Sequence, residues 1–181
     1  MNACCLFAWW GFNLWVPAFL SLPPARGGIG LASHAMTSIV IFMQLGMWLG
    51  YVTFGYISDA FGRKRTYIVY LLAAAALLLV FSTLHTAIAL FFLAPCVAFA
   101  ATGYFSGFAA VTAEIYDTRI RSTAQGFTYN TGRLASAAAP FIVGSLADKH
   151  GFASAFLASA LAFLAAAFLW FFIPETRPHR T

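Results

Sequence analysis

The chain alternates between long stretches that are almost free of charge and short segments rich in charge, proline or glycine. The long stretches cover residues 3–22, 35–58, 66–113, 123–147 and 152–173. A helix needs about 20 mostly apolar residues to cross roughly 30 Å of hydrocarbon, because each residue adds about 1.5 Å. Four stretches therefore have the length of one membrane crossing, and residues 66–113 have the length of two.

Residues 66–113 carry no formal charge, and His85 beside Thr86 marks the expected turn between two helices. This division brings the predicted number of spans to six. Strands are not expected, because the Ala- and Leu-rich stretches lack the alternation over about ten residues that marks a membrane barrel. The pattern predicts an all-α membrane protein in which residues 1–181 form a single transmembrane domain.

Composition supports lipid as the main solvent of this surface. Apolar residues make up 62% of the chain and charged residues only 8%, whereas about a quarter of an ordinary soluble domain is charged. The net charge of +5 does not indicate nucleic-acid binding, because the basic residues form short clusters beside uncharged stretches, as membrane anchors do. Cys4, Cys5 and Cys96 lie in apolar segments without ligand spacing to the histidines, so no metal, disulfide or cofactor is expected.

Basic residues are distributed unequally between alternate loops. One set of loops contains Arg63, Lys64, Arg65, Arg119, Arg121, Arg177 and Arg180, and the other contains Arg26 and Lys149. Loops rich in Lys and Arg stay on the cytoplasmic side of a membrane. We therefore expect a multi-pass protein of the cell inner (plasma) membrane with both termini in the cytoplasm.

Two segments share the pattern Gly-x-x-x-Asp-x-x-Gly, at residues 55–62 and at residues 144–151. Each closes the second helix of a predicted group of three, and the two fall on opposite sides of the membrane. Inverted repeats of this kind occur in many secondary transporters. The sequence therefore predicts two three-helix units, over about residues 1–84 and 86–173.

Three motifs resemble the major facilitator superfamily. Residues 55–65 are similar to its signature loop, residues 114–133 to the loop and eleventh helix of bacterial organic-acid and sugar-type members, and residues 174–177 to its usual ending after helix twelve. The resemblance implies a twelve-helix transporter of which this chain is the carboxy-terminal half, helices seven to twelve. It also implies a partner, an amino-terminal six-helix half. Asp117 and Pro178 depart from the sugar-type pattern, where Pro and Gly are usual.

The resemblance assigns a gating role to the signature loop, as a latch between inward-facing and outward-facing states. The residues concerned are Gly55, Asp59, Gly62, Arg63, Lys64 and Arg65. Asp59 has the spacing to pair with Arg63 or to accept bonds from a neighbouring helix terminus. The alternative is a solvated turn with basic anchors. In the next loop we expect Glu114 to pair with Arg119 or Arg121, with a proton relay as its alternative role.

Polar residues inside the spans are candidates for substrate contact. Arg133 lies about 15 Å into its span, where an unpaired guanidinium is costly unless it faces a cavity or a partner. Tyr129, Asn130 and Arg133 share one helix face, and an Arg beside an amide and a phenol suits a carboxylate. The alternative is a structural Arg bonded to carbonyl groups or to Glu114. Asn13, on one face with Trp9, and Gln44, on one face with Tyr51, are further candidates, although interhelical bonding is the commoner role for such residues.

These observations predict one half of a secondary active transporter for a small polar solute. Arg133 favours an organic anion, and proton coupling is expected. No nucleotide-binding Gly-x-x-x-x-Gly-Lys-Ser/Thr pattern is present to support ATP drive. An enzyme is not expected, because the spans carry no cluster of His, Asp and Glu that would activate water. The alternative is a truncated membrane protein without transport activity, or a scaffold that binds other membrane helices.

Overall fold

The computed structural model describes residues 1–175, and over these residues the chain is helical, with no strand. The all-α prediction is confirmed. Arg177 and Arg180 lie outside the described residues. The helices are α1 (Asn2–Asn13), α2 (Val16–Ser21), the short 3-10 helix η1 (Pro24–Arg26), α3 (Ser33–Phe61), α4 (Arg63–Thr83), α5 (Ala87–Thr102), α6 (Phe105–Ile115), α7 (Arg121–Ser136) and α8 (Ala139–Trp170).

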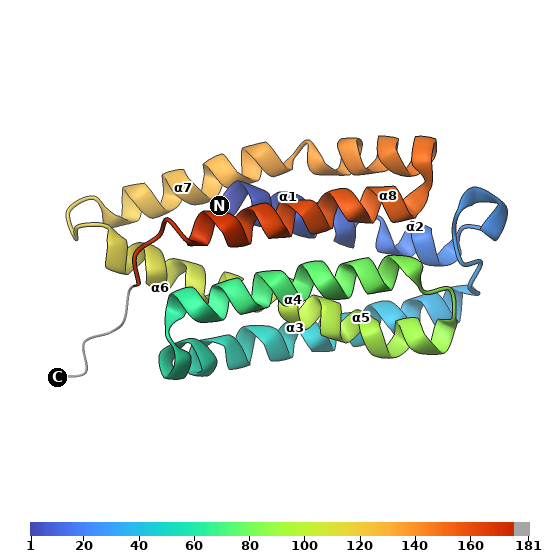
Figure 1. Ribbon diagram of the computed structural model, residues 1–181, viewed down its shortest axis with the longest axis horizontal. Coiled ribbons are helices and arrows are strands. Elements are labelled where there is room, and N and C mark those ends of the chain that lie inside the picture. The colour runs from blue at the N-terminus through green and yellow to red at the C-terminus, as the bar shows by residue number, and fades with distance from the viewer. Residues whose placement is uncertain (176–181) are drawn as a thin grey trace.

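The helices form one elongated bundle and run back and forth along its long axis (Figure 1). α3 packs along α5, α4 packs along α8, and α1 packs along α7 and α8. The α3–α4 junction and the α6–α7 loop lie at the left end of Figure 1. The α2–α3 loop and the α4–α5 loop lie at the right end. We call the left end the basic end, because it contains Arg63–Arg65, Arg119 and Arg121.

Within residues 1–175, five helical segments are long and apolar enough to cross a membrane, over Asn2–Ser21, Ser33–Phe61, Arg63–Thr83, Ala87–Ile115 and Arg121–Trp170. The last contains 50 residues, which at about 1.5 Å per residue is far longer than one crossing. Gly151 interrupts it with a non-helical backbone, and α8 doubles back on itself at the right end of Figure 1. This reversal supports two crossings, and the count of six spans stays a prediction.

Prolines explain two of the mid-span breaks. A proline cannot donate to the carbonyl four residues before it, so a helix ends or kinks there. α1 ends at Asn13, four residues before Pro17, and α7 ends at Ser136, four residues before Pro140. The indole N–H of Trp15 donates to the carbonyl oxygen of Pro140 at 3.0 Å. The two breaks are therefore joined to each other.

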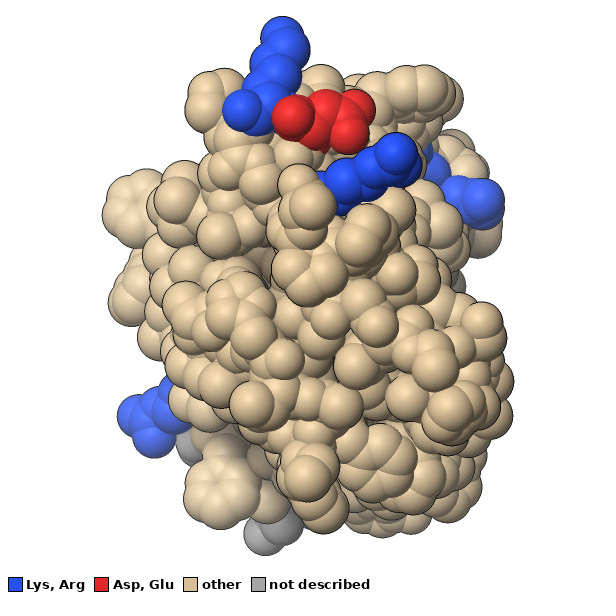
Figure 2. Space-filling model, turned by 90° about the vertical axis from the view of Figure 1, so that its right-hand side faces the viewer, with Lys and Arg blue, Asp and Glu red and all other residues tan. Residues whose placement is uncertain are grey.

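Large apolar side chains cover much of the outer surface. Phe141, Phe172 and Ile88 are among many large apolar side chains that lie mostly exposed. Figure 2 looks onto the end of the bundle opposite the basic end, and most of the visible surface is uncharged, with basic and acidic side chains near its upper edge and a separate basic side chain at its lower left. Such a surface is stable in lipid and not in water, which makes the chain a multi-pass membrane protein.

Glycines bring α3 and α5 into backbone contact. A Cβ atom added at Gly50 would lie 2.6 Å from the carbonyl oxygen of Phe99, and one at Gly103 would lie 2.8 Å from that of Gly50. One at Gly46 would overlap the carbonyl group of Pro95. These distances show close packing of the two backbones at the glycines. It accounts for the tight pairing of a span from each predicted three-helix unit.

The last glycine of each Gly-x-x-x-Asp-x-x-Gly segment has the same kind of backbone conformation. Gly62 has φ 96° and ψ 143°, and Gly151 has φ 82° and ψ 166°. Only glycine adopts these angles at low cost. Each of these glycines separates two antiparallel helical arms. The common turn supports the predicted internal repeat, and the unit boundaries stay a prediction.

Candidate substrate-binding site and gating loop

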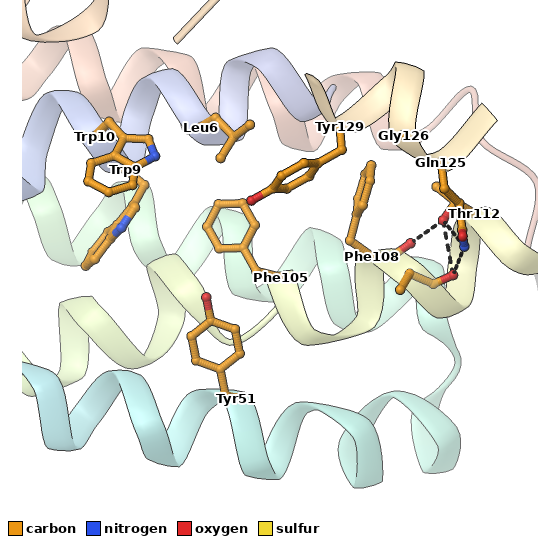
Figure 3. Close-up of a pocket in the computed structure, with 11 residues that line it drawn as sticks. Leu6, Trp9, Trp10, Tyr51, Phe105, Phe108, Thr112, Gln125, Gly126 and Tyr129 are labelled. Carbon is orange, nitrogen blue, oxygen red and sulfur yellow. Dashed lines mark hydrogen bonds between the residues drawn. The ribbon is translucent and has the colours of Figure 1, made fainter. Parts of the chain in front are cut away.

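A cavity of about 480 Å³ lies between α1, α3, α6 and α7. Its walls are mostly aromatic (Figure 3). The rings belong to Trp9, Trp10, Tyr51, Phe105, Phe108 and Tyr129. Trp10, Tyr51 and Tyr129 are still exposed, so the four helices form one open wall of a site and do not enclose it.

Two polar side chains mark the end of the cavity nearest the basic end. The amide nitrogen of Gln125, on α7, donates to the carbonyl oxygen of Ala109 at 2.8 Å and to the hydroxyl of Thr112 at 3.0 Å, both on α6. These bonds appear as dashed lines in Figure 3. They join α6 to α7 beside the cavity. The amide oxygen of Gln125 accepts no hydrogen bond from a group within residues 1–175, so it is available as an acceptor for a ligand.

Arg133 lies next to the cavity through an aromatic contact. Its guanidinium carbon is 5.9 Å from the centre of the Tyr129 ring, and Tyr129 lines the cavity. Within residues 1–175 Arg133 forms no ion pair with a carboxylate. Its charge therefore lies beside one rim of the cavity, on the exposed side of α7.

Three other predicted substrate residues do not line the cavity. Asn130 donates its amide to the carbonyl oxygen of Gly126 in its own helix, Asn13 lies at the end of α1, and Gln44 is exposed on α3. Seven residues, or almost two full turns, separate Gln44 from Tyr51, which places both on the same side of α3. Substrate contact by these three residues stays a prediction.

Sequence reasoning missed most of the cavity. Trp9 and Tyr51 were candidates as helix-face companions of Asn13 and Gln44, and both line it. Phe105, Phe108 and Gln125 were not singled out. An apolar ring in an apolar span carries no signal of its own. Gln125 did carry a signal, because an amide inside a membrane helix requires a hydrogen-bond partner.

The signature loop holds two carboxylates around one guanidinium. Arg63 opens α4, and its terminal nitrogen lies 2.8 Å from Glu114 on α6 and 3.6 Å from Asp59 on α3. The Arg63 side chain is only 11% exposed, whereas that of Asp59 is 61% exposed. The expected pairing of Asp59 with Arg63 is present, and the closer contact is the one with Glu114. The three charges join α3, α4 and α6 at the basic end.

The expected pairing of Glu114 with Arg119 or Arg121 was wrong. Glu114 bonds to Arg63 instead. Arg119 uses its backbone N–H to bond to Asp117, and Arg121 approaches the hydroxyl of Thr118 at 3.5 Å. The reason is geometric: α6 ends at Ile115 beside the start of α4, while Arg119 and Arg121 lie beyond the turn.

Lys64 joins the signature loop to the end of the described chain. Its ammonium group donates to the carbonyl oxygen of Phe171 at 2.8 Å, and its backbone N–H donates to the carboxylate of Glu175 at 3.3 Å. Gly55, by contrast, has no atom within 4 Å of a Cβ built on it. The latch role of the loop stays a prediction.

An all-α bundle with a lipid-compatible surface, an open aromatic cavity and a charged helix junction has the architecture expected of a membrane transporter. The model of the Major Facilitator Superfamily matches residues 1–181. The chain belongs to this superfamily, and its members matched here are transporters, not enzymes.

Curated relatives are similar along most of this chain. It is 30% identical over 170 residues to a protein of Cupriavidus pinatubonensis named "Probable 4-methylmuconolactone transporter", covering 91% of this chain and 37% of that protein. It is 28% identical over 157 residues to the cis,cis-muconate transport protein of Acinetobacter baylyi, covering 87% of this chain and 37% of that protein. This chain therefore spans about two fifths of the length of these relatives.

A solved structure shows the same fold. A crystal structure of a peptide transporter in complex with sulfate superposes with a TM-score of 0.80 at 18% sequence identity. The match covers 94% of this chain and 35% of that one. The likeness at this identity concerns the fold alone.

Proposed function

We propose that this chain is the carboxy-terminal half of a secondary active transporter that moves a small, planar organic anion. The observation that carries the proposal is the open aromatic cavity between α1, α3, α6 and α7. Alternating access would expose this cavity to one side of the membrane at a time. The gating loop at Asp59, Arg63 and Glu114 would hold one of the two states.

The lining of the cavity favours a flat, unsaturated solute. Aromatic rings bind planar molecules by offset stacking and by edge-to-face contact. Ligand sites are mostly apolar, with a few polar groups that fix the orientation of the ligand. Gln125 and Thr112 supply such groups at one end, and Arg133 supplies positive charge beside Tyr129.

The opposite wall of the cavity belongs, in this proposal, to an amino-terminal six-helix half. The exposed rings of Trp10, Tyr51 and Tyr129 would be covered by it. The short coverage of the relatives supports the same division. Six further spans encoded upstream would agree with a split or interrupted transporter. Their absence would favour the alternative, a membrane protein without transport activity.

The substrates named for two relatives support an organic anion as the proposed substrate. One carries the name of cis,cis-muconate, a dicarboxylate, and the other that of a methylated muconolactone. We also propose coupling to protons, with Glu114, whose carboxylate contacts Arg63 in the gating loop, as the candidate proton carrier. We propose that both termini lie in the cytoplasm, because basic residues are concentrated in the loops on that side. Reporter fusions at Gly28 and Arg65 would test this orientation, and a cytoplasmic signal from Gly28 would overturn it.

Uptake by the complete transporter tests the binding role of Arg133. Arg133→Lys keeps the charge but loses the planar pair of donors, so the half-saturation concentration should rise while protein level holds. Arg133→Ala should abolish uptake of an unsaturated dicarboxylate and have little effect on a neutral analogue. Collapse of the proton gradient should stop uptake if protons drive it.

Arg119→Lys is the matched control, because Arg119 is exposed in a loop outside the cavity. A structural Arg133 predicts a different result: Arg133→Ala would lower the amount of folded protein, and Arg133→Lys would transport with unchanged affinity. A well-expressed Arg133→Ala protein with normal affinity would end the proposed role of Arg133.

A further inference from the structure

A second hollow lies between α3, α4 and α5, away from the aromatic cavity. It has a volume of about 380 Å³, and its lining is entirely apolar. Its lining includes Gly46 and Leu49 on α3, Val69, Ala73 and Leu77 on α4, and Ala100 on α5. The small side chains of Ala73 and Ala100 leave this space unfilled. We call it the outer groove.

The outer groove faces away from the proposed partner half. Tyr51 lines the aromatic cavity and Leu49 lines the outer groove. Two residues of helix correspond to a rotation of about 200°, so these side chains leave α3 in nearly opposite directions. A partner half that covers the aromatic cavity would leave the outer groove open to the bilayer. Its surroundings there are lipid.

Three consecutive basic residues begin α4, and their surroundings differ. Arg63 bonds to two carboxylates, and Lys64 bonds to the end of α8. Arg65 is exposed and forms no ion pair or side-chain hydrogen bond within residues 1–175. Its charge is therefore available to a ligand. It also lies in the first turn of α4, where the helix dipole adds positive potential.

Arg65 lies one helical turn before the outer groove. Residues four apart occupy the same helix face, so Arg65 precedes Val69, which lines the groove, followed by Ala73 and Leu77 along the same helix. A cation at the end of the helix is thus followed by the apolar outer groove. A phospholipid has the matching arrangement, with an anionic headgroup followed by a hydrocarbon tail.

We propose that the outer groove binds an anionic phospholipid, with its phosphate at Arg65 and one acyl chain along Val69, Ala73 and Leu77. Positive charge near a membrane surface attracts anionic lipids by about 1 kcal/mol per basic residue. The apolar lining excludes a polar ligand, because it offers no hydrogen bond. A lipid in this position would fill the hollow beside the close contact of α3 and α5.

Lipid binding to the purified full chain tests the proposal. Native mass spectrometry in detergent would compare phosphatidylglycerol with phosphatidylcholine of identical acyl chains. We expect phosphatidylglycerol to bind about five-fold more tightly. Arg65→Gln should abolish this preference. Arg119→Gln is the matched control, since Arg119 is exposed at the same end of the bundle but in another loop, and it should retain the preference.

A second arm tests the acyl chain. Ala73→Phe should fill the outer groove and weaken the binding of both lipids, while soluble glycerol phosphate should not compete. If Ala73→Phe fails to elute as a folded monodisperse species, Leu49→Asn takes its place. It puts a polar group at the exposed rim of the outer groove and should also weaken the binding of both lipids. Equal losses in Arg65→Gln and Arg119→Gln would overturn the proposal in favour of general surface charge. Unchanged lipid binding in the folded groove variants would overturn it as well.

Discussion

The two Gly-x-x-x-Asp-x-x-Gly segments form the same turn but are held by different forces. After Gly62 comes Arg63, whose guanidinium bonds to Glu114 on α6. After Gly151 comes Phe152, whose ring packs against Phe19 on α2, with centroids 5.5 Å apart. In each case the residue after the glycine contacts a helix of the other three-helix unit.

The same glycine turn is therefore stabilised by apolar packing in one place and by ion pairs in the other. Phe152 is buried in an aromatic cluster with Phe12, Phe19, Phe81 and Phe156, and such packing is insensitive to salt and ligands. The junction at Arg63 instead consists of charges that are partly hydrated, so its free energy changes with salt and with any competing charge. We call the contacts of Arg63 with Asp59 and Glu114 the polar junction, and the contacts of Phe152 with its aromatic neighbours the aromatic junction. The polar junction is suited to opening, and the aromatic junction to staying closed.

Disrupting the aromatic junction should have the largest effect on the free energy of unfolding. Phe152→Ala should lower the free energy of unfolding by about 3 kcal/mol, because a buried ring leaves a cavity that its neighbours only partly fill. Denaturant titration in detergent would measure it. Phe141→Ala is the control, since that ring is 80% exposed, and it should change stability by less than about 0.5 kcal/mol. Equal effects would mean that Phe152 is not a core residue.

The shared turn predicts equal effects at its two glycines. Gly62→Ala and Gly151→Ala should each lower the free energy of unfolding by about 2 kcal/mol, because their backbone angles are strained for any side chain. Gly55→Ala should be neutral or slightly stabilising, since Gly55 is helical and has open space around it. Chemical denaturation measures all three. A loss at only one of the two turn glycines would argue against the equivalence of the turns.

The charged junction should be weaker and sensitive to salt. Arg63→Gln should lower the free energy of unfolding by about 1–2 kcal/mol, because it leaves Glu114 and Asp59 without a cation. The difference from the parent protein should shrink in high salt. Lys149→Gln, in the second segment, is the control and should have no effect. A salt-independent loss at Arg63 would indicate packing instead of charge.

The smallest expected effect separates the two aspartates. Asp59→Asn should cost less than about 1 kcal/mol, since its pair with Arg63 is long and exposed. Asp148→Asn should cost nothing measurable, because Asp148 forms no ion pair within residues 1–175. Unfolding midpoints of the two variants, measured side by side at low salt, would resolve the difference. The reverse order would contradict the assignment of the polar junction to the first segment.

The sequence by itself determined the class of structure. Span lengths, the scarcity of charge and the glycine patterns depend on local composition, and lipid imposes helices on any such chain because backbone groups must bond internally. The close contact of Gly46 and Gly50 with α5 also follows from the local pattern, because two glycines four residues apart permit another backbone to approach closely. The pairing of Asp59 with Arg63 followed from their spacing of four residues.

Only the tertiary structure decided which apolar residues form the site. In a soluble helix the polar face marks the outside, but here lipid and core are both apolar, so periodicity does not distinguish Phe105 in the cavity from Phe141 in lipid. The partner of Glu114 was equally hidden, because Arg63 lies far away in sequence and near only after α4 and α6 have packed. The aromatic cavity and the outer groove exist because separate helices meet, and no single stretch of sequence contains either.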